Sequence, residues 1–134
     1  MEIISISLDK ETLTGMGEAQ RRLGFKSRSK MIRATINSLL NEHAALDRIK
    51  GRHDIVFVIT YKENERNHVS NMLHGYEGAI KTTVHQHHSA LCLDILNVDA
   101  DADTIRRLYG VLNHTKCVKS VNFVLLGQAS VHAH

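Results

Sequence analysis

Four side chains in the second half of the chain have the types and the spacing to hold one metal ion: His74, His85, His87 and Cys92. His85 and His87 are two positions apart, so on a strand they point to the same face, about 6–7 Å apart along the backbone. Cys92 follows a short turn, and a hairpin would bring its sulfur back toward both imidazoles. His74 falls at the end of the preceding helix. The same spacing also fits two surface histidines beside a core cysteine.

Three imidazoles and one thiolate form a borderline-soft set of ligands. A planar arrangement of this set suits Ni(II) or Cu(II), and a tetrahedral arrangement suits Zn(II). Mg²⁺ and Ca²⁺ prefer oxygen ligands and are excluded as the natural ion. The sequence contains no combination of nucleophile, base and acid, no phosphate-binding glycine loop and no paired carboxylates. We therefore predict a metal-binding protein that is not an enzyme.

Residues 54–134 are predicted to form one domain of mixed strands and helices. The apolar patterns indicate helices at 64–76 and 103–113, and strands at 55–61, 79–87, 91–98 and 117–126. The order β-α-β-β-α-β is the split βαβ, or ferredoxin-like, arrangement. His85 and His87 then lie on the second strand of this domain, and Cys92 lies at the start of the third. Many small regulatory domains share this arrangement, which by itself specifies no function.

Residues 1–46 are predicted to form a smaller unit of one strand and two helices. The side chains of residues 2–8 alternate between two faces of a predicted strand. The inner face contains Ile4, Ile6 and Leu8, and the outer face contains Ile3, Ser5 and Ser7. Helical spacing follows at 10–23, and again from Ser27 or Ser29 to about residue 46. The polar stretch 47–53 contains a glycine and is predicted to be a linker. The predicted fold class is therefore α+β with two domains.

A single short strand cannot bury its own edges, so the N-terminal unit is predicted to pair its strand with that of a second copy. The product is a two-stranded antiparallel ribbon over a four-helix core, and such a ribbon fits the major groove of DNA. The outer side chains of the strand would face base edges. Arg28 and the free backbone amides at Ser29 and Lys30 would face phosphate. A dimerisation module without DNA binding is the alternative.

Positive charge is concentrated in the N-terminal unit, although the whole chain has a formal net charge of only +3. Residues 10–33 contain seven basic and two acidic side chains. Such a segment suits a polyanion, or forms a solvated helix face. No apolar run is long enough to span a membrane, and no signal-peptide pattern is present. Together with the presence of only two cysteines, these features indicate a cytoplasmic protein.

Both halves of the chain contain motifs of one known family. The second half contains Leu73-His74, then Val84-His85-Gln86-His87, then Cys92-Leu93-Asp94-Ile95. These segments resemble the nickel-responsive repressors (NikR), in which one histidine is followed after eleven positions by His-X-His on a strand, and then by Cys-Leu-Glu. The N-terminal order of strand, helix, Gly-Phe-Lys-Ser-Arg-Ser and helix resembles the ribbon-helix-helix repressors. The resemblance covers nearly the whole chain.

The resemblance implies an assembly and a mechanism for this chain. It implies a ribbon-helix-helix DNA-binding domain joined to an ACT-like regulatory domain, in a homotetramer that is a dimer of dimers. One Ni(II) per subunit would be held by His85, His87 and Cys92 of one chain and His74 of a neighbour, with Cu, Co or Zn as substitutes. Asp94 would orient a ligand. Nickel binding at the tetramer interface would control the binding of a palindromic DNA operator.

The sequence departs from the family pattern at several positions. The turn between His87 and Cys92 is one residue shorter than usual, and Asp94 stands where the family has Glu. The first outward strand position is Ile3, where the family usually has an arginine that can make a bidentate contact to guanine. Some members hold an auxiliary cation with acidic residues on the second helix, whereas this chain has Lys30 and Ala34 there.

Two alternatives stay open, and the departures at Ile3, Lys30 and Ala34 motivate the first of them. One is a paralogous ribbon-helix-helix regulator that responds to a different metal or to a small ligand. The other is a metal-buffering or antitoxin-like interaction protein without operator specificity. The terminal His132-Ala133-His134 is interpreted as a tail that need not have a role.

Overall fold

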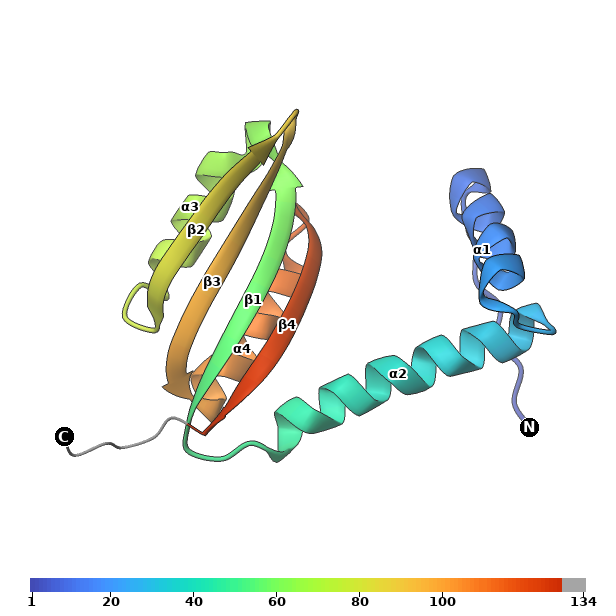
Figure 1. Ribbon diagram of the computed structural model, residues 1–134, viewed down its shortest axis with the longest axis horizontal. Coiled ribbons are helices and arrows are strands. Elements are labelled where there is room, and N and C mark those ends of the chain that lie inside the picture. The colour runs from blue at the N-terminus through green and yellow to red at the C-terminus, as the bar shows by residue number, and fades with distance from the viewer. Residues whose placement is uncertain (129–134) are drawn as a thin grey trace. The chain divides into compact units, whose positions relative to one another are not determined.

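The computed structural model describes residues 1–128, and the chain divides into two compact units, Met1–Ala45 and Leu46–His134. The terminal His132 and His134 lie outside the described residues. The N-terminal unit contains α1 (Lys10–Leu23) and most of α2 (Arg28–Arg48) (Figure 1). α1 begins at Asp9, whose carboxylate accepts a hydrogen bond from the Thr12 amide at 2.6 Å. It ends at Gly24, which adopts the left-handed conformation that glycine tolerates best (φ +76°).

The predicted strand at 2–8 does not form in this chain, where residues 1–9 have neither helix nor strand. A strand needs a neighbour for its backbone N–H and C=O groups, and the N-terminal unit contains no second strand among its described residues. The side chains of Ile3 and Ile4 are therefore 92% and 81% exposed. The predicted inner face is exposed as well, and the pairing that the strand would need cannot be satisfied within one chain.

The second unit contains the predicted order β-α-β-β-α-β within its described residues. Its elements are β1 (Arg52–Lys62), α3 (Arg66–His74), β2 (Ile80–His88), β3 (Leu91–Asp101), α4 (Ala102–His114) and β4 (Val118–Gln128), with a short 3-10 helix, Glu63–Glu65, before α3. The strands form one sheet in the order β2-β3-β1-β4, and all neighbouring pairs are antiparallel. Both helices lie on the same face of this sheet (Figure 1).

The core of the second unit lies between the sheet and its two helices. Phe57 is fully buried at its centre, stacks on Tyr109 with ring centroids 6.2 Å apart, and contacts Phe123 edge-on. Most other core side chains are aliphatic: Leu46, Ile49, Ile55, Ile59, Val69, Leu96, Val98, Ile105, Leu108 and Leu112. A core of this kind follows from a composition with only 4% aromatic residues.

The opposite face of the sheet is not covered by either helix. Its side chains alternate with the core residues along each strand. Many of them are apolar and remain exposed or half-buried: Val56, Val58, Val84, Leu93, Ile95, Val124 and Leu126. We refer to these residues as the open face of the sheet.

The predicted linker, 47–53, has structure over part of its length. α2 continues to Arg48, and β1 already begins at Arg52. Leu46 and Ile49 are buried in the core of the second unit. The Arg106 guanidinium donates hydrogen bonds to the carbonyls of both residues, at 2.9 and 3.2 Å. These bonds satisfy a carbonyl at the end of α2 that has no partner within the helix.

The turn between β2 and β3 is a tight hairpin, in which His88 pairs with Leu91. Ser89 has a positive φ of +59°. Replacing Ser89 by glycine should raise the free energy of unfolding by about 0.5 kcal/mol. The left-handed conformation costs an L-residue about 1–2 kcal/mol, and the greater freedom of glycine in the unfolded chain offsets about 0.5–1 kcal/mol of that gain. Urea denaturation measures the difference.

Ala90, the other residue of the turn, has no positive φ and provides the matched control. Ala90→Gly should lower the free energy of unfolding by about 0.5–1 kcal/mol, because glycine there relieves no strain. A change of the same sign for both variants would contradict this account of the turn.

Candidate metal centre

The β2–β3 hairpin brings three of the four predicted ligands together. His85 lies opposite Asp94 and His87 lies opposite Cys92, and all four side chains share the helix-covered side of the sheet. One potential ligand atom from each of His85, His87 and Cys92 lies within 4.8 Å of the others. The Cys92 sulfur is 3.9 Å from His87 Nδ1. We refer to His85, His87 and Cys92 as the hairpin triad.

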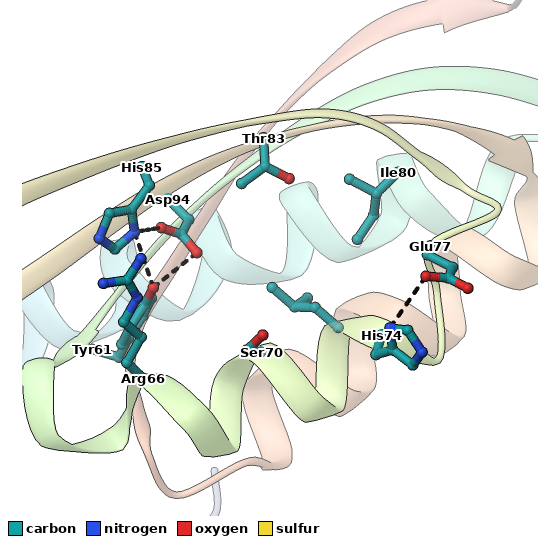
Figure 2. Close-up of a pocket in the computed structure, with 10 residues that line it drawn as sticks. Tyr61, Arg66, Ser70, His74, Glu77, Ile80, Thr83, His85 and Asp94 are labelled. Carbon is teal, nitrogen blue, oxygen red and sulfur yellow. Dashed lines mark hydrogen bonds and ion pairs between the residues drawn. The ribbon is translucent and has the colours of Figure 1, made fainter.

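His85 is held in one orientation by a buried acid and a tyrosine (Figure 2). Its Nδ1 lies 2.5 Å from Asp94 Oδ1, and the Tyr61 hydroxyl donates a 2.9 Å hydrogen bond to Asp94 Oδ2. A carboxylate beside Nδ1 places the proton on that nitrogen and leaves a lone pair on Nε2. Burial and the hydrogen bond to Asp94 raise the pKa of Tyr61, so its hydroxyl remains a donor.

The remaining nitrogen of His85 fits a metal ion. His85 Nε2 is buried and has no hydrogen-bond partner in the structure. An unpaired buried acceptor is costly, and a bond to a cation would remove that cost. Bonds of 2.0–2.3 Å to nitrogen and sulfur place the ligands of one ion at most about 4.6 Å apart. The hairpin triad therefore needs only small side-chain rotations to close on a single ion.

A second acid lies beside His87. Glu63 Oε1 is 3.9 Å from His87 Nε2, on the side of the ring away from the thiol. A carboxylate thus lies beside each imidazole of the hairpin triad, and a neighbour of this kind can fix the orientation of a metal-binding ring. Cys92 is fully buried, and burial together with the charge of Glu63 raises the pKa of its thiol.

The fourth predicted ligand, His74, is not part of this cluster. It ends α3, its side chain is 77% exposed, and its Nδ1 lies 3.2 Å from Glu77 Oε2. His74 and His85 line a common hollow of about 340 Å³. Figure 2 shows them at opposite ends of it, with His74 turned toward Glu77 and away from His85. Within one chain, three of the four predicted ligands therefore lie together, and His74 lies apart from them.

Asp94 was predicted from the sequence, whereas Tyr61 and Glu63 were not. Tyr61 pairs with Cys92 across β1 and β3, and Glu63 follows directly after the end of β1. Neither residue belongs to a local motif. Their positions depend on the register between β1 and β3, which spacing within the hairpin cannot reveal.

The residues predicted to contact DNA are all exposed. Ile3, Ser5 and Ser7 lie in the extended N-terminal segment, and Arg28, Ser29 and Lys30 form the first turn of α2. The Lys30 amide donates a 3.1 Å hydrogen bond to the Ser27 hydroxyl, which caps the helix. The amides of Arg28 and Ser29 have no partner within the helix, as expected for a first turn.

A family model and individual relatives both connect this chain with nickel-responsive regulators. Residues 55–126 match the family described as the NikR C-terminal nickel-binding domain. A provisionally named nickel-responsive regulator from Methanococcus maripaludis is 30% identical over 131 residues, which cover 94% of this chain and 92% of the relative. A similarly named protein from Methanococcoides burtonii is 30% identical over 123 residues, covering 88% and 87% of the two chains.

The structure also resembles that of an uncharacterized protein from Thermotoga maritima. The two have a TM-score of 0.53 and 24% sequence identity, over 57% of this chain and 99% of the other. This likeness supports the fold alone. Along residues 1–128, none of the helices combines the length and the apolar character that crossing a membrane requires.

Proposed function

Since this chain belongs to the nickel-responsive regulator (NikR) family, whose members are regulators and not enzymes, we propose that it is a repressor whose operator binding is controlled by Ni(II). Ni(II) is the cofactor of this family's C-terminal domain. The observation that carries the proposal is the hairpin triad, in which one potential ligand atom of each residue lies within 4.8 Å of the others and the buried Nε2 of His85 has no hydrogen-bond partner.

We propose that one Ni(II) per subunit is bound by His85, His87 and Cys92 of one chain and by His74 of a neighbour. His74 is exposed and lies beside Glu77, away from its own triad, which leaves its ring accessible to a second chain. The open face of the sheet supports assembly, because apolar side chains gain by burial against a copy. Bound Ni(II) supplies the bonds that join two subunits, and the assembly is the proposed homotetramer.

The exposed apolar and basic side chains of the N-terminal unit support a DNA-binding role. Large apolar side chains of the segment 2–8 and of both helices are exposed: Ile4, Ile6, Leu8, Leu13, Ile36, Leu39 and Leu40. A second copy would bury them, and its segment 2–8 would pair with this one to form the ribbon. The basic residues of 10–33 and the amides at Arg28 and Ser29 would then contact phosphate.

Asp94→Asn should weaken Ni(II) binding by about 10–100-fold, the usual cost of removing a group that orients a metal-bound histidine. An asparagine cannot accept hydrogen bonds from both Tyr61 and His85, since one of its two polar atoms is a donor. Isothermal titration with Ni(II) measures the loss. Asp103→Asn, on the exposed side of α4, is the matched control and should bind as the natural chain does.

Asp94→Glu is the conservative variant and should keep most of the affinity, because Glu still presents a carboxylate. Equal losses in the Asn and Glu variants would mean that packing at this buried position decides affinity, and that the orienting role is wrong.

The function is tested by measuring DNA affinity in the presence and absence of metals. A duplex is first selected from a random library by the Ni(II)-loaded protein. The affinity of the protein for this duplex is then measured in the presence of Ni, Cu, Co or Zn and in the absence of metal. Coupling between two sites is typically 5–150-fold, so Ni(II) should tighten binding within that range and the selected duplex should be palindromic. By reciprocity, the duplex should tighten Ni(II) binding by the same factor.

Two results would overturn the proposal. Tight DNA binding that does not depend on Ni(II) would favour a paralogous regulator that responds to another metal or to a small ligand. Strongly salt-dependent binding without sequence preference would favour an interaction protein without operator specificity.

A further inference from the structure

The segment 2–8 already has one side turned toward the helices. Ile6 and Leu8 line a hollow together with Leu13, Met16 and Ile32, all within the N-terminal unit. In the proposed ribbon, where side chains alternate between two faces, the odd-numbered positions would face away from the helices. Among these, Ile3 has the large side chain, and it is 92% exposed.

The outward positions lack the side chains that read three of the four bases. Bidentate contact to guanine requires arginine or lysine, contact to adenine requires asparagine or glutamine, and cytosine is recognised by a carboxylate. The outward side chains here are Ile3, Ser5 and Ser7, which include none of these groups. Serine accepts more than one base. An exposed aliphatic side chain has one specific partner in the major groove, which is the C5-methyl group of thymine.

We propose that Ile3 is a specificity-determining residue that reads thymine methyl groups, so that each operator half-site has a T·A pair at the position that Ile3 contacts. This inference rests on the proposed DNA-binding function and adds the chemistry of the site that is read. Attraction to phosphate would come from the basic residues of 10–33, and sequence discrimination would come largely from an apolar contact.

Uracil provides a sharp probe, because it differs from thymine in DNA only by lacking the methyl group. The Ni(II)-loaded full-length protein is used to select a duplex, and each thymine is then replaced by uracil in turn. Loss of one buried methyl group should weaken binding about fourfold, and loss of both symmetry-related methyl groups should weaken it on the order of 10-fold. Uracil at thymines outside the contacted position should have no effect and serves as the internal control.

The variants assign the effect to Ile3. Ile3→Ala should bind the thymine and uracil duplexes equally well, and Ile3→Arg should select guanine at the same position. Asn41→Ala, at an exposed position of α2 outside the residues proposed to contact DNA, is the control and should retain the full thymine preference. Circular dichroism and sedimentation confirm that each variant keeps its fold and assembly, so that a loss of discrimination is not a loss of structure.

The outcomes separate this inference from the function on which it rests. If the natural protein selects a duplex but tolerates uracil at every position, Ile3 does not read methyl groups, whereas the repressor function stands. The same conclusion follows if Ile3→Ala weakens binding to both duplexes equally, because Ile3 would then stabilise the dimer. If no duplex is selected with Ni(II) bound, the proposed function itself fails.

Discussion

Cys92→Ala should abolish the thiolate-to-nickel charge-transfer band and weaken Ni(II) binding by at least on the order of 100-fold. The band requires a sulfur bonded to the ion, and Cys92 provides the sulfur 3.9 Å from His87 Nδ1. The thiol is fully buried between the sheet and its helices, so no solvent molecule can readily take its place. Absorption spectra recorded during a Ni(II) titration measure both the band and the affinity.

The second cysteine provides the control. Cys117 is partly buried just before β4 and belongs to no cluster of metal-binding side chains in the described chain. Cys117→Ala should leave the band and the affinity unchanged. Because Cys92 also packs in the core, Cys92→Ser is measured beside Cys92→Ala, since serine keeps the volume and removes the sulfur. A band that survives in both Cys92 variants would contradict the proposed ligand set.

Mixing two inactive variants should restore nickel binding. His74→Ala leaves the hairpin triad intact but removes the fourth ligand, and Cys92→Ala does the reverse. If His74 comes from a neighbouring chain, some sites in a mixed assembly combine an intact triad with an intact His74. Random exchange of subunits should restore about one quarter of the sites. The charge-transfer band measures this fraction after the two variants are unfolded together and refolded.

A ligand set within one chain gives the opposite result, because every chain in the mixture then lacks one ligand. Two further mixtures serve as controls. His74→Ala refolded with itself, and Cys92→Ala refolded with His85→Ala, should restore no band, since the second pair has a damaged triad in every chain. No band in the mixture of His74→Ala with Cys92→Ala would exclude a site shared between subunits. A band in the mixture of Cys92→Ala with His85→Ala would instead mean that His85 and Cys92 come from different chains, and the proposed ligand set would be wrong.

The extent to which the site was predictable depends on how far apart in the sequence its parts lie. The hairpin triad lies within eight residues, where the alternation of a strand and one short turn determine which side chains meet. Tyr61 is more than thirty residues away from Cys92, and it reaches the site only through the register of β1 against β3. Sequence patterns specify the face of a strand, but not its pairing register.

In the fold, too, the pattern within a segment could be predicted from the sequence but its pairing could not. The four strands and the two α-helices of the second unit were predicted to within a few residues, because apolar periodicity and burial agree there. The strand at 2–8 was predicted from the same kind of pattern and does not form, since its hydrogen-bond partner is not part of the chain. The family assignment identifies nickel as the ion. The roles of His74 and of the DNA-reading residues remain predictions, because they depend on contacts between chains.

If the open face of the sheet is buried between subunits, the response to nickel would depend on the concentration of the protein. If the fourth ligand belongs to another subunit, then only assembled subunits have a complete site, and dilution lowers the apparent affinity for the ion by mass action. A cell that keeps few copies would thus need more nickel before repression begins, while a cell with many copies would respond earlier. The exposed valines and leucines of the sheet would set that threshold, although none of them touches the metal or the DNA.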